Sequence, residues 1–273
     1  MIAGGPERIV CLTEETTETL YLLGEEHRIA GISGYTVRPA QARREKPRVS
    51  AFVSANVEKI LALRPDLVIG FSDIQADIAR DLIKRGLSVL VFNQRSVAEI
   101  LAMIGTLAAI VGAAERGAKL IAELETGLAA IRFRAGSFPV RPRVYFEEWD
   151  EPMISGIGWV SELIGIAGGE DIFADLARAP DARGRIVADP AEVVRRQPDI
   201  IVASWCGKKF RPERLRGRPG WSDIPAVRDD RVFEIKSADI LQPGPAALTD
   251  GVKRLHEIVA AWVEAESRSA TLA

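Results

Sequence analysis

ILALRPDLVIG, residues 60–70, has a second copy in the chain, VVRRQPDIIVA, residues 193–203. In each copy an apolar helical turn leads into Pro-Asp, and a fully apolar strand follows. The proline ends the helix, and the aspartate turns the chain before the buried strand. One copy alone is an ordinary helix-to-strand junction. Two copies that lie far apart in the chain indicate that one lobe has been duplicated.

Outward from the first copy, short β-branched runs alternate with helical patterns, which is typical of a parallel sheet built from βαβ units. Glycines at 24 and 86 stand where helix ends need a positive φ. The predicted strands are Arg8–Leu12, Ile29–Ile32, Leu67–Gly70 and Ser88–Phe92, and the predicted helices are Thr16–Leu23, Val57–Leu63 and Ile74–Arg85.

A long helical region separates the two copies. One apolar face runs from Val97 to Val111, and a second helix is predicted from about Ala113 to Phe133. Its length of roughly 30 Å is enough to cross a small domain, so we expect a rigid strut. After Gly136 the alternation resumes, with predicted strands at Val144–Phe146, Ile200–Ser204 and Arg231–Glu234 and predicted helices at Trp159–Ala167, Ala191–Gln197 and Leu248–Glu264.

These patterns predict an α/β fold of two Rossmann-like lobes with parallel sheets, joined by a long rigid helix. The predicted boundaries are residues 1–95 for the first lobe, 96–135 for the linker helices including the strut, and 136–273 for the second lobe. A chain of 273 residues is long enough for two lobes, each with its own core.

Composition excludes several function classes. The 36 basic and 38 acidic residues leave a net charge of -2, so no surplus of cations is available for nucleic acid. No apolar run is long enough to span a membrane. The sequence offers no nucleophile–base pair and no cofactor fingerprint, and His27 and His256 lie away from the predicted strand ends. We therefore predict a ligand-binding protein that is not an enzyme, has no intrinsic cofactor and no metal site, and is a monomer.

Acidic residues follow the first strand of each lobe. Thr13-Glu14-Glu15 stands in the first lobe, and Glu147-Glu148-Trp149-Asp150 stands in the second. If both groups point into one cleft, their carboxylates face a cation, a metal or the amide-rich rim of a ligand. The alternative is that they are solvated loop ends or charges at a helix N-terminus.

The segment after the second repeat strand, SWCGKKFR at residues 204–211, is expected at the ligand-facing edge of the second lobe. Trp205 can stack on a planar ligand. Cys206 is either an axial ligand to the metal of such a planar ligand, or a small residue in a tight turn. Lys208, Lys209 and Arg211 either pair with an anionic ligand or form a solvated surface.

Three longer segments resemble the class III substrate-binding proteins of ABC importers, the group that carries cobalamin, ferric siderophores and haem. They are RIVCLTEETTETLYLLGEEHRIAGIS (8–33), NVEKILALRPDLVIG (56–70) and SELIGIAGGEDIF (161–173). The resemblance extends from about Glu7 to Trp262. Through GISGYTVRPAQ (31–41) and EPMISG (151–156) the chain is most similar to the cobalamin-binding branch. The resemblance implies a ligand in a cleft between the lobes, at the carboxyl ends of both sheets, and a small opening motion.

The resemblance also implies ligand-binding residues. Tyr35 matches a tyrosine that lines the corrinoid cleft, and Asp239 matches an aspartate that contacts the corrin side chains. Phe71 stands where relatives place a tryptophan, and Met153 stands where they place an aromatic residue before Ser155-Gly156. Together with Glu14, Glu15, Trp149, Trp205 and Cys206, these residues are the predicted ligand site.

Docking to an ABC permease is implied as well, because a glutamate on each lobe of such proteins meets arginines of the permease. Glu58, seven residues before Pro65, matches the first of these glutamates. Ala191 occupies the second position, and Glu192 follows it about 100° further around the helix. Glu58 and Glu192 are the predicted docking residues.

Several functions stay open at this point. The first is a corrinoid or related metal-tetrapyrrole carrier, for ABC-type uptake or for handling inside the cell. The others are a ferric siderophore or haem binder, a chelatase-like enzyme, and a cytoplasmic sensor or chaperone with the same fold. The opening MIAGGPERIV has no signal-peptide pattern. The location is therefore periplasmic or extracytoplasmic if an export signal precedes this sequence, and cytoplasmic if it does not.

Overall fold

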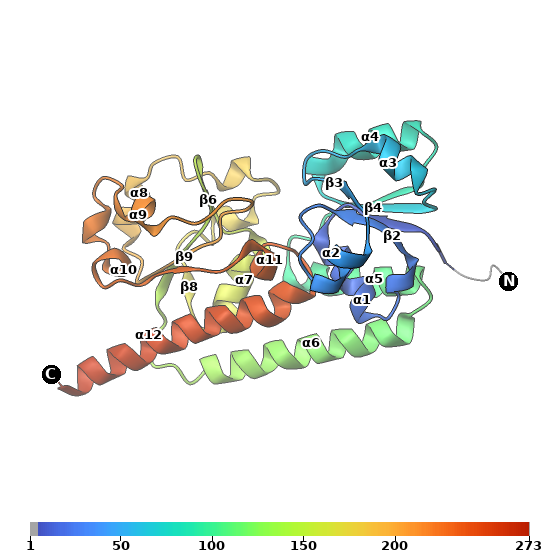
Figure 1. Cartoon of the computed structure of the whole chain (residues 1–273). Helices are drawn as coiled ribbons and strands as arrows, with labels where there is room; N and C mark the ends of the chain where they lie inside the picture. Colours follow the sequence, from blue (N-terminus) through green and yellow to red (C-terminus); the bar gives the residue numbers. More distant parts are fainter. Residues whose placement is uncertain (1–4, 273) are drawn as a thin grey trace. The chain divides into compact units, whose positions relative to one another are not determined.

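A computed structural model describes residues 5–272, and the contacts within the chain divide it into two units. Unit 1 comprises the chain up to Gln94, Ala98–Leu124 and Gln242–Pro245. Unit 2 comprises Arg95–Val97, Glu125–Leu241 and the chain from Ala246 onward. Each unit is a sheet covered by helices (Figure 1). The short segment Gln242–Pro245 returns to unit 1 from the far end of the sequence.

Unit 1 contains a parallel sheet in the order β3-β2-β1-β4-β5, with β1 in the centre. Successive residues of a strand point to opposite faces, so the apolar run after Arg8 feeds two cores. Ile9 and Cys11 pack with α1 and α5, whereas Val10 and Leu12 pack with α3 and α4. The elements are β1 (Ile9–Cys11), α1 (Glu14–Leu22), β2 (Ile29–Ser33), α2 (Ala40–Glu45), β3 (Arg48–Ser50), α3 (Val57–Ala62), β4 (Leu67–Phe71), α4 (Ala76–Lys84), β5 (Val89–Phe92) and α5 (Val97–Ile110).

Unit 2 is built around β6, which pairs in parallel with β8 and β9, while β9 pairs in parallel with β10. One strand departs from the predicted parallel sheet: β7 pairs antiparallel with β6, because only Glu151-Pro152 separates the two strands. The elements are β6 (Arg143–Asp150), β7 (Met153–Ser155), α7 (Gly158–Ala167), β8 (Glu170–Asp171), α8 (Ala191–Arg196), β9 (Ile200–Ala203), α9 (Pro212–Arg216), α10 (Pro225–Arg228), β10 (Val232–Glu234), α11 (Ser237–Ile240) and α12 (Val252–Leu272).

The two Pro-Asp copies have the same local structure. After each helix, the residue directly before the proline has a positive φ, Arg64 at 47° and Gln197 at 44°. The side chain of Asp66 accepts the backbone N–H of Arg8 at 3.0 Å, at the start of β1. Asp199 accepts the backbone N–H of Arg143 at 2.8 Å, at the start of β6. In both units the aspartate therefore fixes the backbone where the central strand begins, directly before β1 in unit 1 and at the first residue of β6 in unit 2.

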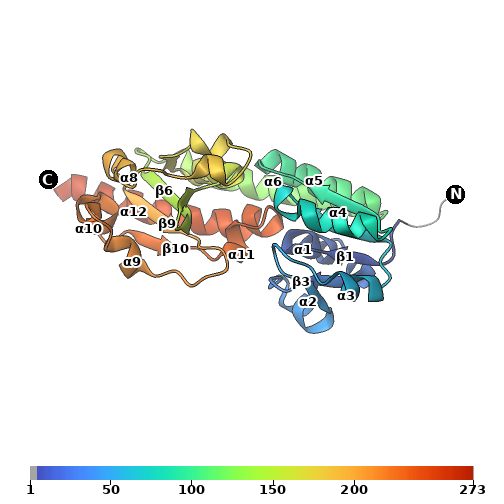
Figure 2. The ribbon, with the colours of Figure 1, turned by 90° about the horizontal axis from the view of Figure 1, so that it is seen from above.

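The predicted strut is one helix, α6 (Ala114–Ala135), and it passes from unit 1 to unit 2 after Leu124. It lies beside α5 (Figure 2), and a Cβ atom at Gly117 would stand 2.4 Å from the Cβ of Ala108. Glycine is therefore required where these two helices meet. Among the helices of residues 5–272, none combines the length and the apolar character needed to cross a membrane.

Candidate functional site

Open parallel sheets bind ligands at the carboxyl ends of their strands. In unit 1 this edge carries four large apolar side chains that are exposed to solvent. They follow β3, β2 and β4, three of the five strands of the sheet, and we call them the apolar rim: Val53 (70% exposed), Tyr35 (55%), Val37 (40%) and Ile74 (43%). Apolar side chains that are grouped on the surface in this way often mark a binding surface.

Beneath the rim, α1 begins with two glutamates whose side chains are buried. Glu14 is 3% exposed and Glu15 is fully buried. Glu14 Oε2 accepts the backbone N–H of Val37 at 2.9 Å, and Glu15 Oε1 accepts the hydroxyl of Thr13 at 2.6 Å. The other oxygen of each carboxyl group is buried and has no hydrogen-bond partner. Glu14 and Glu15 are therefore neither solvated loop charges nor members of ion pairs.

Burial raises the pKa of both carboxyl groups. Loss of hydration is the main cause, and it raises the pKa of Glu14 to about 8 although the Val37 N–H opposes the shift. It raises the pKa of Glu15 to about 7, against the opposing hydrogen bond from Thr13. Glu18, one turn further along α1, raises the pKa of both groups by its charge. At neutral pH Glu14 is therefore mostly protonated, and Glu15 is divided between its protonated and ionised forms.

Gln75 joins the ends of the strands in unit 1. Its buried side chain accepts the N–H of Phe71 at 3.0 Å and donates to the carbonyls of Phe52, at 3.0 Å, and Leu12, at 3.4 Å. A Cβ atom at Gly70 would stand 2.8 Å from the Gln75 oxygen, so a larger residue there would displace this side chain. No sequence motif marks Gln75, since its three partners come from three separate segments.

The segment Gln242–Pro245 packs against Glu15 and Gln94 of unit 1. Gln94, itself 4% exposed, donates to the carbonyl of Pro243 at 2.9 Å. A Cβ atom at Gly244 would stand 2.5 Å from the Cβ of Glu15, so backbone packs directly on that glutamate. The sequence did not predict this contact, because it forms only when the chain comes back to unit 1 after residue 241.

In unit 2 the acids at the end of β6 are paired. Glu147 is fully buried and forms a bidentate ion pair with Arg218, with N–O distances of 2.5 and 3.0 Å. It also accepts the Tyr145 hydroxyl and the Trp205 indole N–H, each at 3.0 Å. Four donors therefore compensate one buried carboxylate, which is what charge burial requires.

The neighbouring acids of β6 are paired too. Glu148 forms a bidentate ion pair with the buried Arg185, with N–O distances of 2.5 and 3.1 Å. Asp150 pairs with Lys208 and, at 3.4 Å, with Arg214. Lys208 also lies over the ring of Trp149, 4.2 Å from its centre, a cation–π contact. The sequence predicted that these carboxylates face a cation, a metal or a ligand. In the structure they pair with arginine and lysine side chains of the protein itself.

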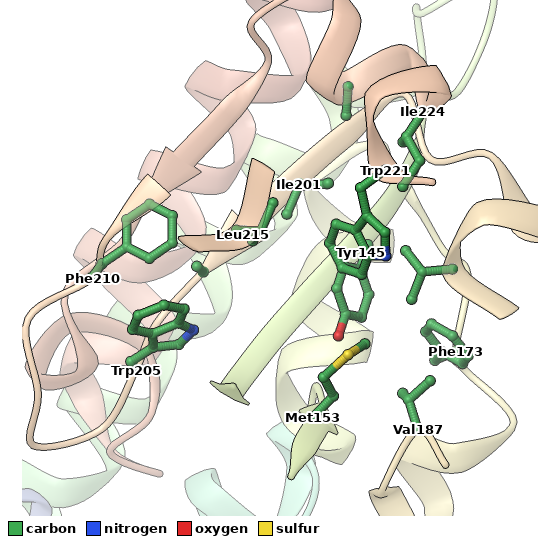
Figure 3. Close-up of a cluster of buried hydrophobic side chains, with 13 residues drawn as sticks. Tyr145, Met153, Phe173, Val187, Ile201, Trp205, Phe210, Leu215, Trp221 and Ile224 are labelled. Atoms are coloured by element: carbon green, nitrogen blue, oxygen red, sulfur yellow. The ribbon is translucent and has the colours of Figure 1, made fainter. Parts of the chain in front are cut away.

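Three predicted aromatic or apolar contacts lie inside the cores. Phe71 is 5% exposed, at the end of β4. Met153 and Trp205 belong to the buried cluster of unit 2, where Trp205 packs edge-on against Phe210 at 5.0 Å between ring centres (Figure 3). Tyr35 and the half-buried Trp149 are thus the predicted aromatic residues with the most ring surface left for a ligand.

The remaining predicted residues lie in unit 2. Ser155 is buried and donates to the carbonyl of Arg185 at 3.1 Å, and Gly156 packs against Phe146. Cys206 is half-buried, and loss of hydration raises the pKa of its thiol, with the charge of Glu148 adding to the shift. Asp239 lines a cavity of about 380 Å³ together with charged side chains of α12.

No metal centre is formed within residues 5–272, where no group of three or more His, Cys, Asp or Glu side chains is arranged to hold an ion. The side chain of His27 is 68% exposed. His256 stacks on Phe138, and its Nδ1 lies 3.0 Å from the carbonyl oxygen of Ala167. Cys11 is buried in the core of unit 1, as its apolar surroundings in the sequence predict.

The two predicted docking glutamates occupy equivalent helical positions. Glu58 is the second residue of α3, and Glu192 is the second residue of α8. Glu58 forms an exposed pair with Arg85 at 3.1 Å, whereas Glu192 pairs with Arg195 and Arg196 on its own helix. Counted from the proline, Glu192 is one residue out of step with Glu58. Counted from the start of the helix, the two glutamates have the same position.

Comparison with known proteins assigns the fold to a family. The sequence profile described as "Periplasmic binding protein" matches residues 9–238. The uncharacterized ABC transporter substrate-binding lipoprotein YvrC of Bacillus subtilis is 27% identical over 93% of this chain and 80% of its own length. The vitamin B12-binding protein of Vibrio cholerae is 28% identical over 91% of this chain and 87% of its own. The periplasmic haem-binding protein RhuT of Roseiflexus is 25% identical, with a TM-score of 0.79 over 93% of this chain and 100% of its own.

Proposed function

The chain belongs to the periplasmic binding protein family, and we propose that its ligand is a metal tetrapyrrole of the corrinoid type. It is a substrate-binding protein and not an enzyme, so the tetrapyrrole is cargo and not a cofactor. Similarity to vitamin B12-binding proteins over most of the chain supports the corrinoid as the first candidate.

The apolar rim of unit 1 is the observation that carries this proposal. Its four exposed side chains are spread along the edge of the sheet from β3 to β4, which suits a broad flat ligand better than a small polar one. Tyr35 supplies an aromatic face for stacking. On unit 2, Trp149 with Lys208 above its ring is the corresponding ligand-contacting surface in this proposal.

Titration of the protein with cobinamide, cobalamin and haemin, followed by absorbance and calorimetry, tests the proposal. At least one of them should bind with a Kd well below about 100 μM, since carrier affinities are far tighter. Tyr35→Ala and Val53→Ser should each weaken that binding by about tenfold. Ile83→Ser, which changes an equally exposed apolar residue on α4, is the matched control and should leave the affinity unchanged. A Kd weaker than about 100 μM for all three ligands would overturn the proposal.

A second candidate is an anionic metal chelate, either haem with its propionates or a ferric siderophore. It is favoured by Lys209 and Arg211, which are exposed in the segment after β9. Replacing both by glutamine should then abolish binding of the chelate, while a corrinoid carrier should lose little. Unchanged affinity for every anionic probe would remove this candidate.

For delivery of the ligand, we propose docking to an ABC permease through Glu58 and Glu192, outside the cytoplasm. Support comes from their equivalent positions on α3 and α8 and from the relative named as a substrate-binding lipoprotein. Fractionation of cells that express the native gene tests the location. Recovery of the protein in the cytoplasmic fraction would instead favour the sensor or chaperone alternative.

A further inference from the structure

The loop after β2, residues 34–38, carries two of the four rim side chains, Tyr35 and Val37. Two glutamates of α1 fix this loop to the helix. Glu14 accepts the Val37 N–H at 2.9 Å, and Glu18 accepts the Nε–H of Arg38 at 3.0 Å. The loop therefore takes its position from the first turns of α1 as well as from β2.

Glu14 makes this contact from a buried position. Its second oxygen has no hydrogen-bond partner, and neither has the hydroxyl of Thr36, a fully buried residue of the loop itself. The charged groups that act on Glu14 are Glu15 and Glu18 on its own helix and Arg38 on the loop. Arg38 is ion-paired with Glu18 at 3.0 Å, so an ionised Glu14 would be buried without a cation of its own.

We propose that Glu14 is a positioning residue of the ligand site: its neutral carboxyl group holds loop 34–38 and the rim residues on it, and its ionisation releases them. The part that concerns the ligand rests on the proposed function, whereas the part that concerns the loop does not. Glu14 itself is covered and acts through Tyr35 and Val37 without contacting the ligand.

The direction of the pH effect follows from burial. Loss of hydration raises the pKa of Glu14 from 4.5 to about 8 when the loop is closed. An open loop would hydrate the carboxyl group and return its pKa toward the ordinary value. The closed loop thus binds the proton more tightly, and closure is favoured at low pH. Opening should rise by up to about tenfold per pH unit between about pH 4.5 and about pH 8, and level off above.

Hydrogen exchange of the ligand-free protein tests the loop. After correction for intrinsic exchange, protection of the amides in loop 34–38 should fall with rising pH in the wild type. Glu14→Gln, which keeps the hydrogen-bond acceptor without the charge, should remove most of this dependence. Glu25→Gln changes a buried, ion-paired carboxylate beyond the other end of α1 and should retain the wild-type profile. Equal pH profiles in the wild type and Glu14→Gln would overturn the inference.

Ligand binding provides the second test, with whichever of cobinamide, cobalamin or haemin binds the wild type. Glu14→Leu removes the acceptor for Val37 and should weaken binding by at least about tenfold at every pH. Glu14→Gln should bind at pH 8.5 as tightly as the wild type binds at pH 6. Unchanged affinity in Glu14→Leu would contradict the positioning role. If no probe binds the wild type, the proposed function fails and hydrogen exchange alone decides this inference.

Discussion

The two units begin their central strands in the same way and end them differently. At the amino end, Asp66 and Asp199 fix the backbone at the start of β1 and β6 with the same kind of hydrogen bond. At the carboxyl end, both units place buried glutamates. Glu14 and Glu15 of unit 1 form no ion pair, whereas Glu147 of unit 2 pairs with Arg218 and accepts two further hydrogen bonds. The duplicated part thus supports the fold, and the part that differs lies at the edge where we propose that the ligand binds.

This difference has a physical meaning. Unit 1 leaves Glu14 and Glu15 without an ion pair, and burial raises the pKa of both, whereas unit 2 compensates the charge of Glu147. A neutral edge suits apolar contact, as the exposed rim of unit 1 suggests. A compensated edge is rigid, because each partner of Glu147 fixes another segment. We therefore interpret unit 1 as the adaptable face and unit 2 as the preformed one.

The largest effect is expected where a compensated charge loses its partner. Glu147→Ala leaves the guanidinium of Arg218, the Tyr145 hydroxyl and the Trp205 N–H without their acceptor, and should destabilise unit 2 by about 3–5 kcal/mol. All five tryptophans lie in unit 2, so denaturant unfolding followed by tryptophan fluorescence reports on this unit. The double variant Glu147→Met with Arg218→Met should recover part of the loss. A stability unchanged by Glu147→Ala would break the comparison.

In unit 1, replacing a buried glutamate should increase the stability instead of lowering it. Because the pKa values of Glu14 and Glu15 are raised to about 8 and about 7, unit 1 is most stable below about pH 4.5 with respect to these groups. It loses this stability as the pH rises through both values. Glu15→Gln should therefore stabilise unit 1 at pH 8 by about 1–3 kcal/mol, measured by hydrogen exchange of β1 amides. Destabilisation at pH 8 would show that the carboxylate has a partner after all.

The duplicated aspartates should behave alike. Asp66→Asn and Asp199→Asn each weaken a charge-assisted hydrogen bond at the start of a central strand, and each should destabilise its own unit by about 1–2 kcal/mol. Hydrogen exchange of β1 and of β6 measures the two effects in one experiment. Losses that differ by more than about 2 kcal/mol would mean that the shared motif does not support both units equally.

The smallest effect belongs to the surface. The pair of Glu58 and Arg85 is exposed on both sides, so Glu58→Gln should change the stability of unit 1 by less than about 1 kcal/mol. Thermal unfolding at low and at high salt measures this. A larger loss would point to a structural role for Glu58 that competes with the proposed docking role.

Much of the fold could be predicted because it depends on local patterns. The Pro-Asp copies, the long helix and the alternation of strands and helices each occupy one continuous stretch, and the structure contains all of them. The antiparallel β7 was not predicted, since it depends on a turn of only two residues after β6. The short elements after β2 and β9 carry too few apolar residues to show a period.

The site was harder to predict, because its chemistry depends on partners that are distant in sequence. In the sequence, Thr13-Glu14-Glu15 and Glu147-Glu148-Trp149-Asp150 are both acidic segments, and nothing in them shows which carboxyl groups will be paired. The fold brings Arg218 to Glu147 across 71 residues and Gln75 to Leu12 across 63. No pattern near Glu14 indicates that its carboxyl group stays unpaired. Tyr35 was identified through a resemblance, and its rim neighbours only through their exposure.

Hydrogen exchange of the protein with and without saturating cobinamide tests the central claim most directly, namely that the apolar rim of unit 1 is a ligand surface. The account predicts slower exchange in the segments that follow β2, β3 and β4, where the rim residues lie, and no change in α4. Bound cobinamide that leaves those three segments unchanged would contradict it.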